Sequence, residues 1–185
     1  MDCKAFQEAL FAPLRATLGP PDPHTLGAIV GFDAGGPLAF RTFGSDASKA
    51  VITYVSCELA VRADQKSGAL GRYELLASSS DQEWVRTILS DIGRMTLDVA
   101  FGDGHTMDIG GWVNDGGLEP PLQGVLFVEE CRTLIEGNAY GVLRVIGITR
   151  AEMEFARANG SARLLACLEE AGVYPDTATN RRSVL

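Results

Sequence analysis

The hydrophobic period of the chain changes near residue 80, and this change constrains the fold more than any other feature. Between residues 27 and 77, apolar and β-branched residues form short runs separated by turn residues, a pattern typical of strands. From Asp81 to about Val99 the spacing becomes helical, and Ser80-Asp81-Gln82-Glu83 matches a capping box. The apolar residues of this helix are Trp84, Val85, Ile88, Leu89, Ile92 and Met95. An amphipathic helix packed on a sheet is therefore expected.

The other segments are assigned from the same patterns. A helix is predicted over Cys3 to Leu18, although Pro13 should disturb it. A second helix should begin at the capping box Thr149–Glu152 and end near Asn159, and a third should cover Ser161 to Ala171. Strands are predicted over Gly27 to Phe32, Leu38 to Phe43, Val51 to Val61, Arg72 to Ala77, Thr106 to Ile109, Gly124 to Glu129 and Val142 to Ile148. Asp33 to Pro37 is predicted to be a hairpin loop, and the third and fourth runs are expected to pair antiparallel.

The order of these elements favours an α+β fold. Strands follow one another through short loops and the helices are segregated, which argues against a doubly wound parallel sheet. We expect a single domain over residues 1–185, with a central mixed, largely antiparallel sheet flanked by helices. Residues 176–185, after Pro175, are expected to be a loose tail.

Composition limits where the chain can work. Its 46% hydrophobic residues are enough for a core, but no apolar run approaches the ~20 residues that a membrane helix needs. The N-terminus lacks the features of a signal peptide, so a cytoplasmic location is expected. Four scattered cysteines, without a Cys-x-x-Cys pair, are interpreted as reduced thiols. They are Cys3, Cys57, Cys131 and Cys167.

The net charge of −8 lies entirely in one part of the chain. Residues 81–136 contain eleven acidic and three basic residues, whereas the remainder contains thirteen of each. Neither nucleic acid nor an anionic membrane is an expected partner, because both require a basic face. The segment is interpreted either as an acidic face that attracts a basic partner or as a solvated surface that maintains solubility.

Motifs for catalysis are weak. Gly102-Asp103-Gly104-His105 lacks the third glycine and the lysine of phosphate-binding loops, so it is interpreted as a turn and no cofactor is expected. His105 beside a carboxylate could act as a general base, although no nucleophile motif accompanies it. The sequence contains no paired His or Cys residues at the spacing typical of a metal site. Trp112, in a glycine-rich loop, is either a core residue or an anchor for a partner.

Several segments resemble the bacterial members of the suppressor of fused (SUFU) family, over roughly residues 50–185. They are Gly71-Arg72-Tyr73-Glu74-Leu75-Leu76, the Trp84 helix, Gly104-His105-Thr106-Met107-Asp108-Ile109-Gly110, Leu126-Phe127, Val145 to Ala156 and Arg182-Ser183-Val184. The resemblance implies an α+β domain with no catalytic residues. Animal members sequester a transcription factor through a second domain that this chain lacks, and bacterial members have been proposed as immunity proteins against polymorphic toxins.

Three hypotheses follow. The first is a non-enzymatic protein-binding module, specifically an immunity protein that neutralises a basic toxin. Its predicted contact residues are Asp98, Asp103, Asp108, Trp112, Asp115, Glu129 and Glu130. The second is a small enzyme that uses His105 with a nearby carboxylate. The third is a subunit of a homo-oligomer that associates through Trp112 and exposed strand edges.

Overall fold

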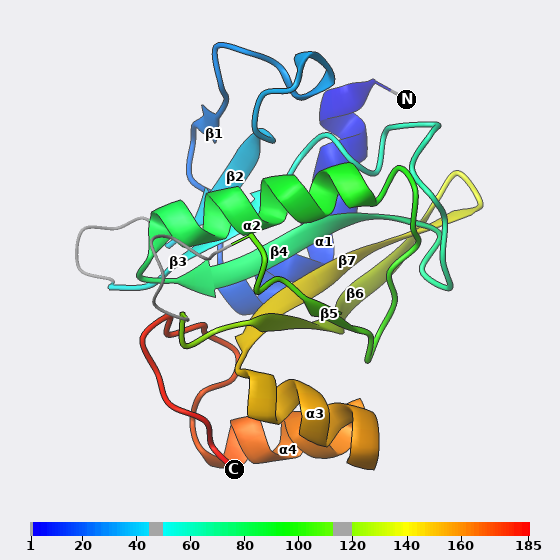
Figure 1. The fold of residues 1–185 in the computed structure, drawn as a ribbon. Helices are drawn as coiled ribbons and strands as arrows, with labels where there is room; N and C mark the ends of the chain where they lie inside the picture. The colour runs from blue at the N-terminus through cyan, green and yellow to red at the C-terminus, as the bar shows by residue number, and fades with distance from the viewer. Residues whose placement is uncertain (1, 45–49, 113–119) are drawn as a thin grey trace.

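A seven-stranded sheet in the order β1-β2-β3-β4-β7-β6-β5 forms the centre of the computed structural model, which describes residues 2–44, 50–112 and 120–185 (Figure 1). The strands are β1 (Thr25–Leu26), β2 (Phe40–Phe43), β3 (Ile52–Ser56), β4 (Arg72–Ser79), β5 (Thr106–Asp108), β6 (Gly124–Ile135) and β7 (Asn138–Ile148). Neighbours pair antiparallel except β4 and β7, which are parallel. The predicted α+β class with a mixed, largely antiparallel sheet is confirmed.

Helices cover both faces of the sheet. α2 (Gln82–Met95) lies in front of it in Figure 1, α1 (Cys3–Leu18) lies behind it, and α3 (Arg150–Asn159) and α4 (Ser161–Glu170) pack together beside β5 and β6. Alternation along β4 explains this arrangement. Tyr73 and Leu75 belong to the apolar cluster under α2, whereas Leu76 belongs to the cluster under α1.

Local signals fixed most helix positions correctly. α1 spans the predicted residues, and Pro13 lies inside it without ending it, because Leu10, Phe11 and Leu14 are buried on either side of the proline. Thr149 and Glu152 form the predicted capping box of α3. The start and end of α2 were wrong: Asp81, rather than Ser80, caps it by accepting a hydrogen bond from the Trp84 amide, and it ends at Met95.

The prediction for residues 27–37 was wrong, whereas the strand expected over Leu38 to Phe43 is present as β2. A hairpin around Asp33–Pro37 does not form, and no strand forms over Gly27 to Phe32, because β1 ends at Leu26 and a 3-10 turn forms at Phe32–Ala34. Phe32 is buried, so this turn serves as an anchor for the loop. β1 pairs with β2 through Thr25 and Leu26 alone.

The prediction of a loose tail was also wrong. Thr177 is buried and forms a parallel bridge with Ser79, whose hydroxyl donates to the Thr177 carbonyl at 2.6 Å. The Arg181 guanidinium donates to both carboxylate oxygens of Glu152 at 2.6 Å. The C-terminal segment is therefore held to the sheet and to α3.

Candidate interaction surface

Trp112 is displayed by a series of turns after β5. The Asp108 carboxylate accepts a hydrogen bond from the Gly110 amide, and buried Ile109 donates through its amide to the Gln123 carbonyl. The Trp112 amide then donates to the Ile109 carbonyl at 2.9 Å. With Ile109 held in the core, the Trp112 side chain remains 41% exposed. It is thus a surface residue and not a core residue.

A hollow of about 420 Å³ lies between Trp112 and α2, and we call it the Trp112 hollow. Its apolar lining includes Trp84, Ile88 and Leu122, with Pro120 at the edge. The ionisable residues in its lining are two acids, Asp81 and Glu83. Asp81 is engaged as the α2 cap and accepts from the Thr179 hydroxyl at 3.1 Å. Glu83 is exposed, so a negative charge borders an apolar floor.

The predicted acidic residues are placed at several separate positions. Asp98 is exposed after the end of α2, and Asp103, in the turn before β5, accepts a hydrogen bond from the Glu129 amide. Asp108 pairs with Gly124 at the start of β6, well before Glu129 along the strand. Asp115 lies outside the described residues.

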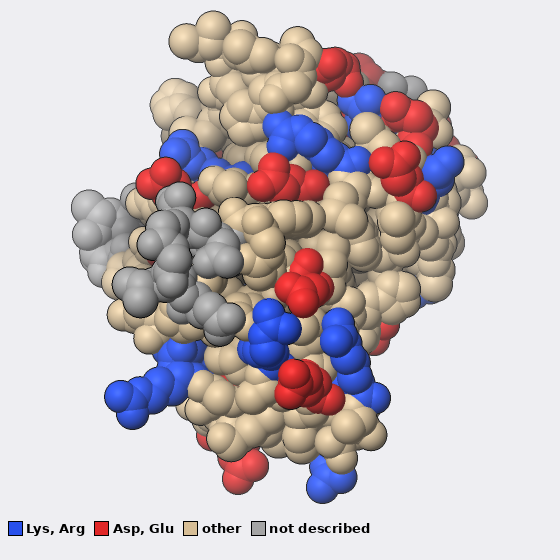
Figure 2. Space-filling model, in the orientation of Figure 1, with Lys and Arg blue, Asp and Glu red and all other residues tan. Residues whose placement is uncertain are grey.

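Ion pairs reduce the acidic character of this segment further. Glu129 pairs with Arg132 at 2.8 Å, and Asp108 lies 3.8 Å from Arg150. Glu130 pairs with the buried Arg144 at 2.6 Å and is mostly buried, which removes it from the candidate contact residues. On the face shown in Figure 2, acidic and basic side chains alternate and no extended area has a single sign.

His105 is exposed in the turn that precedes β5. Its amide donates to the Gly102 carbonyl and its carbonyl accepts from the Phe127 amide. Within the described part of the chain, its imidazole makes no hydrogen bond to a carboxylate. The pair that an acid–base role for His105 requires is therefore not formed in this structure.

A buried ion pair between Glu152 and Arg181 holds the C-terminal tail, which includes Thr179, a residue that lines the Trp112 hollow. Glu152 is fully buried, and its carboxylate accepts from Arg181, from its own cap residue Thr149 and from the Val184 amide. Burial alone would raise the pKa of Glu152, but these hydrogen bonds outweigh it and hold the pKa below its ordinary value. The pair joins α3 to the tail, which carries Thr179 to the hollow.

Glu74 is a second buried carboxylate, and the sequence analysis assigned it no role of its own. It accepts hydrogen bonds from the Ser56 hydroxyl at 2.5 Å and from the amides of Leu59 and Ala60 at 3.2 and 2.8 Å. Burial raises the pKa of Glu74 to about 7, although the three hydrogen bonds oppose the shift. Its contacts lie within one loop and the neighbouring strand, so we assign it a structural role.

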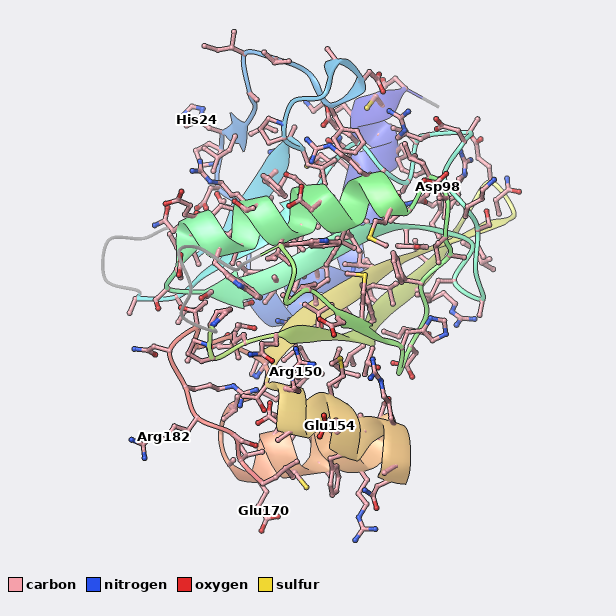
Figure 3. The ribbon with its side chains drawn as sticks, in the orientation of Figure 1. His24, Asp98, Arg150, Glu154, Glu170 and Arg182 are labelled. Atoms are coloured by element: carbon pink, nitrogen blue, oxygen red, sulfur yellow. The ribbon has the colours of Figure 1, made fainter. Side chains whose placement is uncertain are left out.

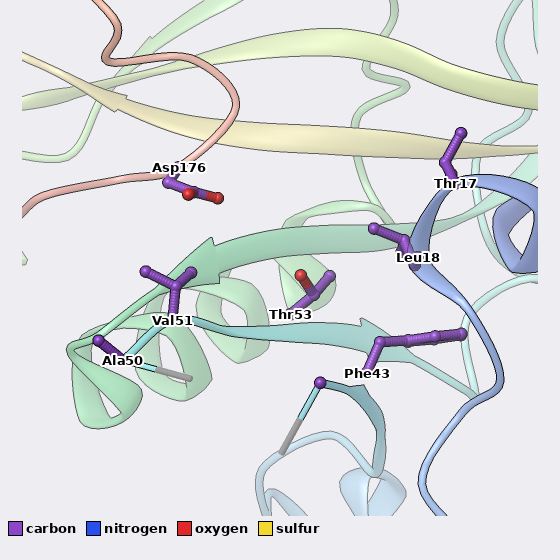
Figure 4. A pocket seen from close by; sticks show the side chains of 8 residues that line it. Thr17, Leu18, Phe43, Ala50, Val51, Thr53 and Asp176 are labelled. Carbon is purple, nitrogen blue, oxygen red and sulfur yellow. The ribbon is translucent and has the colours of Figure 1, made fainter. Parts of the chain in front are cut away.

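A second hollow of about 390 Å³ lies between the end of α1, the β2–β3 edge and the tail (Figure 4). Its lining includes Leu18, Phe43, Val51 and Thr53, and Asp176 supplies a charge. The Thr53 hydroxyl is bonded to Ser78, which accepts from Arg144. No exposed aromatic residue borders it within the described residues, so the Trp112 hollow is the better candidate for a partner.

Two further observations concern cofactors and membranes. Among residues 2–44, 50–112 and 120–185, no three His, Cys, Asp or Glu side chains are grouped so that they could hold a metal ion. In the same part of the chain, every helix is too short or too polar to cross a bilayer.

Comparisons with known proteins identify the fold. The chain matches solved structures of the Sufu–Fu complex (17% identity, TM-score 0.71, covering 98% of this chain and 91% of the other) and of Drosophila Suppressor of Fused (17%, 0.68, 96% and 51%). It also matches a SUFU homologue from Neisseria gonorrhoeae (17%, 0.66, 98% of both chains). At this identity these matches concern the fold, and a comparison with curated proteins finds no match.

The sequence itself carries the stronger relationship. The profile of the Suppressor of fused protein (SUFU) family matches residues 40–182, which include β2 to β7, α2, α3, α4 and the Glu152–Arg181 pair. The resemblance noted from short segments over residues 50–185 is thereby confirmed. The chain belongs to the suppressor of fused (SUFU) family.

Proposed function

We propose that this chain is a non-enzymatic protein-binding module, and specifically an immunity protein that neutralises a basic polymorphic toxin. The observation that carries the proposal is the Trp112 hollow, which combines an exposed tryptophan, an apolar floor and the exposed carboxylate of Glu83. Tryptophan is among the residues that most often dominate interface energies. A partner that inserts an apolar side chain next to a lysine or arginine would satisfy both parts of the hollow.

Two further facts support a basic protein as the partner. The chain carries a net charge of −8, which attracts a positively charged partner over distances of about 10 Å at moderate salt. It also belongs to a family of protein-interaction domains, and one of its structural relatives was solved as a Sufu–Fu complex. Exposed Asp98, Asp103 and Asp108 would contribute to attraction at long range rather than to direct contact.

The proposal is tested with the protein encoded by the adjacent reading frame as the probe. Replacing Trp112 by alanine should weaken binding by about 100-fold, because the side chain is the central apolar anchor, and should abolish protection when the two proteins are co-expressed in a growth assay. Affinity is measured by biolayer interferometry. Leu134→Ala is the matched control, since Leu134 is 73% exposed on the β6–β7 hairpin and should not affect binding.

Reversing the charge of Glu83 separates electrostatic attraction of the partner from its apolar contact with Trp112. Glu83→Lys should slow association several-fold and reduce its dependence on salt, because it inverts the charge at the rim. Equal affinities for the wild-type chain and for Trp112→Ala would reject the Trp112 hollow as the binding site. Growth protection by Trp112→Ala at wild-type level would reject it in the same way.

A further inference from the structure

A loop above α2 presents apolar side chains to water while its base is firmly held. Ile29 is fully exposed, and Leu26 and Val30 are 42% and 51% exposed. All three lie within five residues, from the end of β1 at Leu26 to the residues just before the 3-10 turn, where the loop rises beyond the sheet in Figure 1. Isolated exposed apolar residues are common, whereas several on one loop make it a candidate interaction site.

The base of this loop is built for rigidity. Phe32 is buried, and the guanidinium groups of Arg62 and Arg94 lie 5.6 and 5.8 Å from the centre of its ring. Arg94 also donates to the carbonyls of Gly35 and Gly36 at 3.0 Å. A loop that is ordered before binding loses little conformational entropy when its tip enters a partner.

An apolar hollow of about 330 Å³ lies directly beside the loop, and we call it the α2 hollow. It runs between the loop residues Leu26 to Ala28 and the first half of α2, and its floor is formed by buried Leu38 and Phe40. A protruding apolar tip and an apolar recess are thus adjacent on one face. A two-fold interface requires this arrangement, because each copy must offer both the tip and its receptor.

The charges at the rim of the α2 hollow are also self-complementary. Glu83 and Arg86 are both exposed and lie three residues apart on α2. In the described part of the chain, neither side chain forms an ion pair with the other or with a third residue. Across a two-fold axis, Glu83 of each copy could face Arg86 of the other, forming two equivalent ion pairs around the apolar centre.

From these observations we propose that the chain forms a two-fold symmetric homodimer, in which Ile29 and Val30 of each copy enter the α2 hollow of the other and Glu83 pairs with Arg86 across the axis. This inference is independent of the proposed toxin partner. The dimer would nevertheless affect partner binding. Glu83 and Thr87 line both the α2 hollow and the Trp112 hollow, so the dimer and a bound partner compete for the same helix.

The apolar part of the dimer is tested with the purified full chain alone. Sedimentation velocity over a concentration series should show a monomer–dimer equilibrium, and Ile29→Asp should weaken it by roughly 100-fold, since two buried anchors are lost per dimer. Leu134→Asp is the matched control and should leave the equilibrium unchanged, because Leu134 is equally apolar and exposed on the distant hairpin. A wild-type chain that stays monomeric up to roughly 1 mM, or a dimer insensitive to Ile29→Asp, would overturn the proposal.

The charged part permits a sharper test. Glu83→Arg and Arg86→Glu should each weaken self-association about 10-fold, because each places two like-charged pairs across the axis. Mixing the two single variants should restore dimers as heterodimers, and the double variant Glu83→Arg/Arg86→Glu should dimerise like the wild type. Misfolding cannot produce such a recovery. Single variants that do not recover on mixing would contradict the pairing.

Trp112→Ala should not affect the dimer. A failure of the dimer proposal can therefore be distinguished from a failure of the proposal that a partner binds at the Trp112 hollow.

Discussion

Replacing Arg181 by alanine is expected to lower the free energy of unfolding by about 3–5 kcal/mol, a large part of the stability of a domain this size. Arg181 is 8% exposed and Glu152 is fully buried, so the truncation would leave an uncompensated carboxylate in the interior. The variant also loses the hydrogen bond from Arg181 to the Gly147 carbonyl at 3.0 Å, which holds the tail to β7. Chemical denaturation followed by circular dichroism measures the change.

The neighbouring arginine provides the control. The Arg182 side chain is exposed and points away from the fold in Figure 3, so Arg182→Ala should change the free energy of unfolding by less than about 0.5 kcal/mol. The two variants remove the same charge from adjacent positions. If Arg181→Ala and Arg182→Ala prove equally stable, the ion pair does not hold the tail and the account of the C-terminal segment is wrong.

Glu74→Ala is the second substitution expected to have a large effect. It would leave the Ser56 hydroxyl and the amides of Leu59 and Ala60 without their acceptor inside the core. Each unsatisfied buried donor costs about 1–3 kcal/mol, so a loss of at least about 3 kcal/mol is expected at pH 5. Thermal or chemical denaturation at that pH measures it.

The pH dependence of Glu74 distinguishes its ionisation from its hydrogen bonds. Its pKa is raised to about 7 in the folded chain from an ordinary value near 4.3 in the unfolded one, so the folded state binds the extra proton between these values. The stability that this proton contributes is complete below pH ~4.3 and is lost as the pH rises through 7.

Glu74→Gln cannot titrate and should remove this part of the pH dependence. The wild type should therefore lose about 2–3 kcal/mol more than Glu74→Gln between pH 5 and pH 8. Glu8→Gln, an exposed carboxylate on α1, should follow the wild type. A wild type whose stability changes with pH in parallel with Glu74→Gln would show that burial does not shift this carboxyl group.

Elements with local signals were predictable from the sequence. The apolar periods of α2, α3 and α4 and the capping box of α3 are encoded locally, and the antiparallel pairing of β3 with β4 was predicted from their succession along the chain. The hairpin of β6 and β7 was predicted too short. The outer half of β6, residues 130–135, lacks a regular polar–apolar alternation, and the turn uses Glu136 at φ +50°, which is not a residue typical of such turns.

Long-range contacts were beyond sequence reasoning. The tail is held by Arg181 and Glu152, which are 29 positions apart, and the Trp112 hollow unites residues from α2, from the loop after β5 and from Thr179. Trp112 was singled out as a candidate anchor because aromatic residues dominate interface hot spots and it lies in a glycine-rich loop. Glu83 was interpreted as a member of a capping box, and its position at the rim follows only from the packing of α2 on the sheet.

Hydrogen–deuterium exchange with and without the partner shows whether a protein binds at the Trp112 hollow, because it locates the contact without any substitution. The chain is compared alone and with the protein encoded beside it, at concentrations that saturate binding. Slower exchange should be confined to residues 81–88, 109–112 and 120–122, which surround the Trp112 hollow. Protection confined to the β6–β7 hairpin or to α4, with no change in residues 81–88, would contradict the account.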